Sequence, residues 1–307
     1  MTQSPMPSPV PGAPKRRSVK PGKLFAWAVV ILLIVLTIFP FYWAIRTALS
    51  TQSQLYAHPG TLLPVGFTFD NFASALGLVS REESIARGGS GRVFHFWRYL
   101  GNTVLVSGMV AICQVFFSAM AAYALARLHF PGRNFIFLCY VAALMIPAIV
   151  LLIPNFVLIS DLGWLNTYQG IMAPALLMSP FAVFFLRQFF LGINGDLEDA
   201  ARIDGAGYAQ IFARIILPLS WGPLVTLGII VLVFQWNSYL WPLLVGRAED
   251  VRTLTVALSV FRSQTPAGSP DWPGLMAGTL LAGLPIFLIF LLLGRRISES
   301  IQFTGVK

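Results

Sequence analysis

Five charged side chains lie within nine residues of one short polar segment, between two long apolar runs. Asn194 can cap a helix there, and acidic side chains in the first helical turn interact favourably with the positive end of the helix dipole. We therefore predict a short helix that begins near Asp196 and breaks at Gly205 or Gly207. The charged residues of this segment are Asp196, Glu198, Asp199, Arg202 and Asp204.

The predicted helix has two chemically different faces. Glu198 and Arg202 are spaced to pair on one solvated face. The other face has small side chains and a glycine at its end, so it can approach the backbone of a partner protein closely, as in helix-in-groove docking. Residues at i, i+3, i+4 and i+7 form this second face: Leu197, Ala200, Ala201 and Asp204. A second amphipathic turn follows the glycines, with Tyr208, Phe212, Ile215 and Ile216 leading to Leu217 and Pro218.

A second group of polar side chains lies inside an apolar run and is flanked by Trp236 and Trp241. Hydroxyl and amide groups beside aromatic rings suit a neutral sugar, because they exchange hydrogen bonds with it and cover its apolar faces. Two structural readings remain open, since polar groups also tie membrane helices together and aromatic residues collect at the membrane interface. The candidate pathway residues are Gln235, Asn237, Ser238 and Tyr239.

The remaining reactive side chains do not form a catalytic pattern. His58, His95 and His129 are scattered without metal-ligand spacing, and the sequence has neither a Gly-x-Ser-x-Gly elbow nor the Walker sequence Gly-x4-Gly-Lys-Ser/Thr. We therefore expect no catalytic residue, no bound metal, no cofactor and no ATP hydrolysis by this chain itself.

The composition places the chain in a lipid bilayer. Hydrophobic residues make up 56% and charged residues 11% of the sequence, with a mean hydropathy of +0.74. Runs without a charged residue or histidine are long enough to cross a hydrocarbon core at about 20 residues each. We predict an all-α membrane protein with six spans, at Leu24–Ile45, Tyr99–Ala126, Asn134–Ile159, Tyr168–Leu186, Leu219–Val245 and Pro273–Gly294.

The distribution of charge predicts the orientation. With six spans both termini lie on one side, and that side holds 13 of the 21 basic residues, for a net charge of +8 against +1 opposite. The positive-inside rule then makes both termini cytoplasmic. The basic balance follows from membrane topology and lipid contact, which argues against nucleic-acid binding.

The polar segment also resembles a known sequence signature. In the permeases of ABC importers, Glu-Ala-Ala is followed after three residues by Gly and after nine more by Ile-x-Leu-Pro. Here Ala200, Ala201 and Gly205 match, as do the later Ile215, Leu217 and Pro218, while Asp199 replaces the leading Glu. Further similarity to the sugar-importer branch, specifically to the smaller maltose-permease subunit, lies in Gln235 to Leu243, Thr253-Leu254, Asp271-Trp272, Arg295-Arg296-Ile297 and Gly305-Val306-Lys307.

This resemblance implies a type I ABC importer permease in a prokaryotic plasma membrane. Its partners would be a second permease subunit, a dimer of ATPase subunits and an external solute-binding protein that delivers the sugar. The residues implied to contact the ATPase are Glu198, Asp199, Ala200, Ala201, Asp204, Gly205, Leu217 and Pro218. The expected organisation is a disordered basic tail (1–23), a first span with an extracytoplasmic segment (24–98), a five-span core (99–296) with a coupling loop (191–218), and a cytoplasmic tail (297–307).

Three alternatives remain. A phosphorylated polyol such as a glycerol phosphate could replace the sugar within the same branch, although no span core carries a cation. An ion-coupled secondary carrier would need ionisable residues at the membrane midplane, and the six cores have none. An intramembrane enzyme would need the paired catalytic groups that the sequence lacks.

Overall fold

The computed structural model describes residues 21–86, 94–262 and 269–302. The chain divides into two compact units, residues 1–44 and 45–307. In the first unit the described residues belong to α1 (Pro21–Ala48), a helix with Pro40 inside it. Most of the predicted basic tail (1–23) and the final residues 303–307 lie outside the described part.

All regular elements of the described residues are helical, which confirms the predicted class. Three short helices follow α1: α2 (Gln52–Ala57), α3 (Asp70–Ala75) and α4 (Arg81–Ala86). The central region contains α5 (Phe96–Arg127), α6 (Arg133–Ala143), η1 (Ala148–Leu151), α7 (Leu152–Asp161), α8 (Tyr168–Leu176) and α9 (Pro180–Leu191). The remaining elements are α10 (Asp196–Ile203), α11 (Tyr208–Ile211), η2 (Phe212–Ile216), α12 (Leu217–Leu219), α13 (Trp221–Trp236), α14 (Leu240–Val245), α15 (Leu254–Ala257), η3 (Leu258–Arg262) and α16 (Trp272–Gln302).

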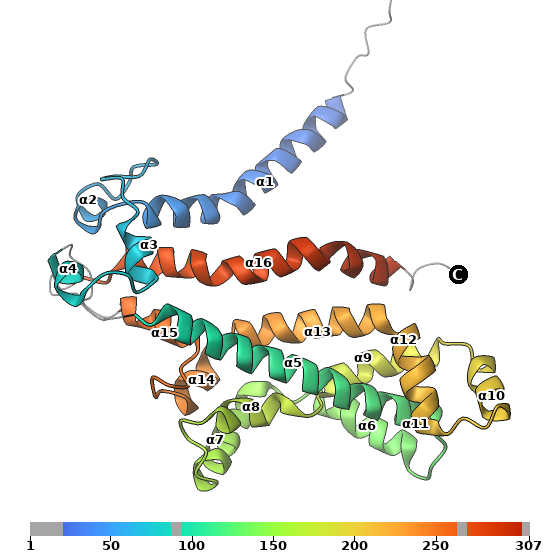
Figure 1. The fold of residues 1–307 in the computed structure, drawn as a ribbon. Coiled ribbons are helices and arrows are strands. Elements are labelled where there is room, and N and C mark those ends of the chain that lie inside the picture. Colours follow the sequence, from blue (N-terminus) through green and yellow to red (C-terminus); the bar gives the residue numbers. More distant parts are fainter. Residues whose placement is uncertain (1–20, 87–93, 263–268, 303–307) are drawn as a thin grey trace, which may run out of the picture. The chain divides into compact units, whose positions relative to one another are not determined.

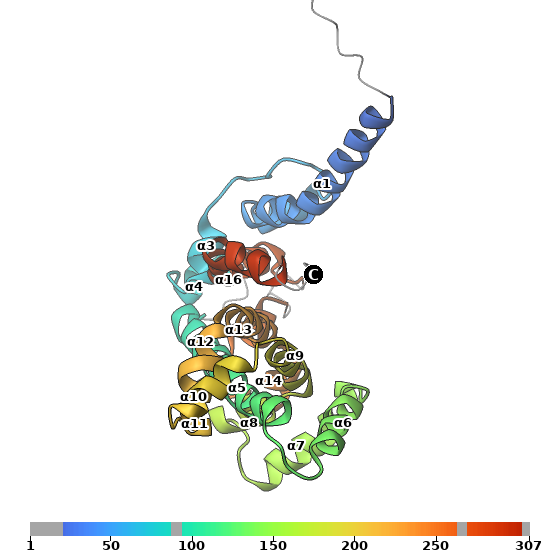
Figure 2. The same cartoon turned by 90° about the vertical axis from the view of Figure 1, so that its right-hand side faces the viewer.

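Helix α5 is the centre of the second unit. It packs against α8, α9 and α13, and α13 in turn packs against α16 (Figure 1, and turned by 90° in Figure 2). Ala119 and Ala122 of α5 are fully buried in this core. Their small side chains allow neighbouring helices to approach closely. Helices in lipid associate largely through such close packing, because no hydrophobic effect drives them together there.

The predicted spans are present, but only three of them are single long helices. Phe25–Ala48, Phe96–Arg127 and Trp272–Leu292 are each long and apolar enough to cross a membrane. The other three are bent pairs: Arg133–Ala143 with Ala148–Asp161 (94°), Tyr168–Leu176 with Pro180–Leu191 (41°), and Tyr208–Leu219 with Trp221–Trp236 (79°). Counting each pair as one span gives up to six in the described part of the chain, the predicted number. The third pair begins at Tyr208, however, within the loop predicted to precede the span at Leu219–Val245.

Two of these bends coincide with a proline. Pro147 has extended backbone angles and immediately precedes η1, and it has no N–H to continue a helix. Pro180 is the first residue of α9, where Ser179 caps the helix by accepting a hydrogen bond from the Ala182 N–H. The fifth predicted span also differs at its end, because α13 stops at Trp236 and residues 240–245 form the separate helix α14.

Candidate functional site

The predicted docking helix is α10, and its two ends have identifiable causes. At its start, the Asn194 Oδ1 accepts a hydrogen bond from the Asp196 N–H (3.1 Å). At its end, the Gly205 N–H donates to the Arg202 carbonyl (3.0 Å) and the Ala206 N–H to the Ala201 carbonyl (2.9 Å), which is the Schellman pattern. Gly205 has φ +84°, in the left-handed region that strongly favours glycine.

The residues that the sequence assigns to one docking face of α10 differ in exposure in the structure. Leu197, Ala200 and Asp204 are exposed, and the neighbouring Ile203 has 88% of its surface exposed. Ala201 instead packs against the central core of the second unit. Helix α10 therefore presents a mixed apolar and acidic strip outward and keeps one of its two alanines inside.

The prediction that Glu198 lies on a solvated face of the helix is wrong. Its side chain is nearly fully buried, and its Oε1 lies 3.1 Å from the Nε of Arg127, at the end of α5. The predicted pair with Arg202 exists, at 3.6 Å, and Arg202 also pairs with the exposed Asp199 at 3.0 Å. A carboxylate can be buried here because a guanidinium compensates its charge.

Arg127 is a site residue that the sequence patterns do not single out. It directly follows the apolar run that ends at Ala126. One signal points to it: an arginine at the end of a span, on the same predicted side of the membrane as an acidic helix. The periodicity of α10 alone could not show which distant segment covers Glu198.

The second half of the 191–218 loop contains α11, η2 and α12, and it leads into α13 (Figure 1). Tyr208 is exposed, whereas Phe212 and Ile215 pack against the core that includes buried Ile216. Residues 212–216 form a π-helical turn, and Leu217 and Pro218 start α12 directly after it.

Three of the four candidate pathway residues line a cavity of about 460 Å³ between the break in the third span and the break after α13. Gln235, Ser238 and Tyr239 are in its wall, together with Asn155 of α7, which the sequence did not single out. The side chains of Asn155, Gln235 and Ser238 make no hydrogen bond with the rest of the described chain. They are therefore free to bond a polar molecule in this cavity.

Asn237 and the two tryptophans have other roles. The Asn237 amide donates to the Val233 carbonyl of its own helix (2.8 Å), and this residue does not line the cavity. The Trp236 indole donates to the Ala282 carbonyl (3.2 Å), and the Trp241 indole to the Ile171 carbonyl (3.1 Å) while its ring lines the cavity. The structure thus brings together three of the four predicted pathway residues and adds Asn155.

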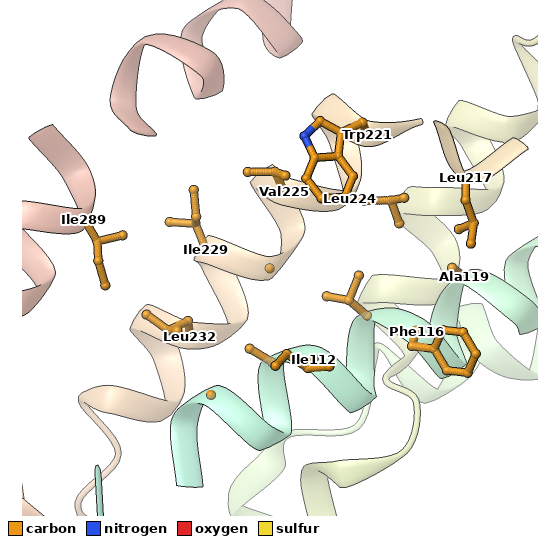
Figure 3. A pocket seen from close by; sticks show the side chains of 14 residues that line it. Ile112, Phe116, Ala119, Leu217, Trp221, Leu224, Val225, Ile229, Leu232 and Ile289 are labelled. Carbon is orange, nitrogen blue, oxygen red and sulfur yellow. The ribbon is translucent and has the colours of Figure 1, made fainter. Parts of the chain in front are cut away.

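A second cavity, of about 540 Å³, differs in chemistry. It lies between α5 and α13 with Ile289 of α16 at its side, and aliphatic and aromatic side chains such as Ile112, Phe116 and Leu232 line it (Figure 3). The indole N–H of Trp221 is the one hydrogen-bonding side-chain group among its lining residues. This cavity offers almost nothing to a polar solute.

These features are those of a membrane component of a transport system. Residues 114–302 match the family described as binding-protein-dependent transport system inner membrane component, and the chain belongs to this family. It is a family of ABC transporter permeases, multi-pass membrane components without enzymatic activity of their own. Within the described residues, no group of three or more His, Cys, Asp or Glu side chains could hold a metal ion.

Similarity to other permeases extends over almost the whole chain. It is 33% identical to the arabinooligosaccharides transport system permease protein AraQ of Halalkalibacterium halodurans, over 94% of this chain and 99% of that protein. It is 33% identical to the sn-glycerol-3-phosphate transport system permease protein UgpE of Brucella abortus, over 89% and 94% respectively. It is 31% identical to the probable ABC transporter permease protein YurM of Bacillus subtilis, over 95% and 91%.

Solved structures support the fold. The chain is similar to a chain of a bacterial ABC transporter involved in the import of the acidic polysaccharide alginate, with a TM-score of 0.75 and 21% identity over 92% of this chain and 99% of that chain. A structure of the bacterial alginate transporter in complex with a periplasmic protein bound to alginate pentasaccharide matches with a TM-score of 0.58 and 16% identity, over 91% and 96%.

Proposed function

We propose that this chain is a permease subunit of an ABC importer for a neutral sugar or oligosaccharide. The observation that carries the proposal is the cavity containing Asn155, Gln235 and Ser238, whose wall combines free amide and hydroxyl groups with the rings of Tyr239 and Trp241. Such a wall can exchange hydrogen bonds with sugar hydroxyls and cover the apolar faces of the ring.

The substrate class is argued from charge. The lining of this cavity contains no acidic or basic side chain, so a phosphate group would find no compensating charge there. The relationship to UgpE keeps a glycerol phosphate as the second candidate. The relationship to AraQ supports the oligosaccharide.

Energy would come from a separate dimer of ATPase subunits that docks on the outward strip of α10. Leu197, Ala200 and Ile203 are exposed there, and a helix with this apolar strip suits a groove in a partner. The sequence has no Walker motif, so the ATPase is a different chain. A second permease subunit would complete the pathway, and an external solute-binding protein would deliver the substrate. With both termini and the coupling loop cytoplasmic, α10 faces the ATPase.

Uptake by a reconstituted transporter tests this function. The chain would be purified with its second permease subunit, ATPase and binding protein, placed in proteoliposomes, and assayed for ATP-dependent uptake of labelled arabinotriose, maltotriose and sn-glycerol 3-phosphate. We expect uptake of a neutral sugar that glycerol phosphate does not compete with. ATP-dependent uptake of glycerol phosphate alone would favour the second candidate, and no ATP dependence with any solute would refute the importer.

A further inference from the structure

Arg127 is the last residue of α5, and it contacts two points of the coupling loop and one at the end of α9. Its Nε pairs with the Oε1 of Glu198 (3.1 Å), and its terminal nitrogen donates to the Phe190 and Ile193 carbonyls. The side chain therefore connects a long central helix, the end of α9 and the inner face of α10. It is largely buried, with 15% of its side chain exposed.

A second contact lies one helical turn earlier on α5. The ring of Tyr123, itself buried, packs on Phe212 with the ring centroids 5.2 Å apart. Tyr123 and Arg127 are separated by four residues, so they lie on the same face of the helix. One face of α5 thus holds both halves of the coupling loop, α10 through Arg127 and the turn before α12 through Tyr123.

We propose that Arg127 is a positioning residue that joins α10 to the end of α5, so that a displacement of α10 moves this central span with it. The proposal rests on the proposed function, in which an ATPase displaces α10. Its physical basis is the buried ion pair: separating the two elements would leave the Glu198 carboxylate with only the more distant Arg202 guanidinium, at 3.6 Å, and would leave the Arg127 guanidinium without its carboxylate, which is unfavourable. The ion pair therefore holds while the elements move.

The guanidinium shape is part of this role. Its planar fork reaches a carboxylate and two carbonyl oxygens at once, whereas a lysine ammonium is a compact point charge. Arg127→Lys keeps Glu198 paired and so keeps the chain folded, but it loses part of the connection. Arg127→Met removes the connection entirely. Arg214→Met is the matched control, because Arg214 is an exposed arginine of the same loop.

Two measurements test the proposal. Hydrogen exchange of the purified full-length chain reports how firmly residues 196–203 are held. In the reconstituted transporter, the reaction of a cysteine at Ser238 with N-ethylmaleimide, with and without ATP and vanadate, reports whether the cavity responds to the ATPase. The reporter chain carries Cys113→Ser and Cys139→Ser, which removes the two native thiols.

We expect Arg127→Met to lose exchange protection in α10 and to lose the nucleotide response at position 238 while ATP is still hydrolysed. Arg127→Lys should lose part of both, and Arg214→Met should match the parent. Parent-like protection and response in Arg127→Met would overturn the proposal. If Arg127→Met does not fold, parent-like values in Arg127→Lys would overturn it instead. A parent that shows no nucleotide response would refute the proposed function, which is a separate result.

Discussion

Ala200 and Ala201 are neighbours in sequence, yet they lie in different surroundings on α10: Ala200 is exposed, and the half-buried Ala201 packs against the central core. Substitution of the two by the same large residue should therefore have different consequences. The sequence placed both on one docking face, and the structure assigns only Ala200 to the outer surface.

Ala200→Trp should leave the chain folded and inserted but abolish its association with the ATPase, or the stimulation of ATP hydrolysis by loaded binding protein, because it adds bulk where a partner must approach. Ala201→Trp should destabilise the chain itself by about 1–3 kcal/mol through overpacking. Thermal unfolding of the isolated chain and co-purification of the ATPase separate the two effects. Normal assembly, stimulation and uptake in Ala200→Trp would contradict the docking assignment.

Gly205 should be sensitive to substitution for a conformational reason. Its φ of +84° lies in the left-handed region, where a β-branched residue is strained by about 1–2 kcal/mol, while a Cβ at this position would meet no atom within 4 Å. Gly205→Val should therefore lower the unfolding temperature of the isolated chain. Gly205→Asn is the matched variant, since asparagine tolerates this conformation.

The unfolding temperature and the co-purification of the ATPase should be measured for both Gly205 variants. If Gly205→Asn keeps parental stability but loses the ATPase, the glycine is also needed for close approach of the partner. Equal stability of the Val and Asn variants would contradict the conformational argument.

Substitution of the polar cavity residues should lower uptake more than substitution of Asn237. Gln235→Leu and Asn155→Leu remove free polar groups from the cavity. A sugar hydroxyl left there without a hydrogen-bond partner would weaken the binding free energy of the sugar by about 1–3 kcal/mol, so uptake should fall. The sequence alone predicts the same loss for Asn237→Leu. Because its amide bonds to Val233, we expect the smaller effect there. Initial uptake rates, measured at fixed ATPase content, give the loss in each variant. A larger loss in Asn237→Leu than in Gln235→Leu and Asn155→Leu would contradict this prediction.

Asp271 should make stability depend on pH. Burial raises the pKa of its carboxyl group above the ordinary value, and the hydrogen bond that it accepts from the Gly274 N–H opposes this only in part. The folded chain then binds this proton more tightly than the unfolded chain. Its contribution to the free energy of unfolding therefore falls as pH rises from about 4, the unfolded pKa, through the raised folded value.

Asp271→Asn should remove this fall while keeping an oxygen to accept from Gly274. The variant should be at least as stable as the parent near neutral pH and should show a flatter pH profile. Unfolding temperatures of the detergent-solubilised chain across this range test the sign. A variant that is less stable at neutral pH than at acidic pH, as the parent is, would contradict it.

Cysteine labelling tests the orientation. In a background with Cys113→Ser and Cys139→Ser, a cysteine at Ser53 should react with an impermeant thiol reagent in intact cells, and one at Ala209 should not. Both positions are exposed on the chain, so accessibility depends on the side of the membrane alone. Labelling of Ala209 without labelling of Ser53 would invert the proposed topology.

The sequence by itself determined the features that depend on local composition and spacing. Charge-free apolar runs predict the spans, because their length matches the bilayer. Asn194 and Gly205 predict the two ends of α10, because neighbouring residues form the turns there, although the N-cap residue is Gly195 and Asn194 precedes it. Only tertiary structure decided the rest: that Arg127 covers Glu198, that Ala201 faces inward, and that Asn155 joins Gln235 in the cavity. Helical periodicity shows which residues share a face, but burial depends on distant segments that pack against that face.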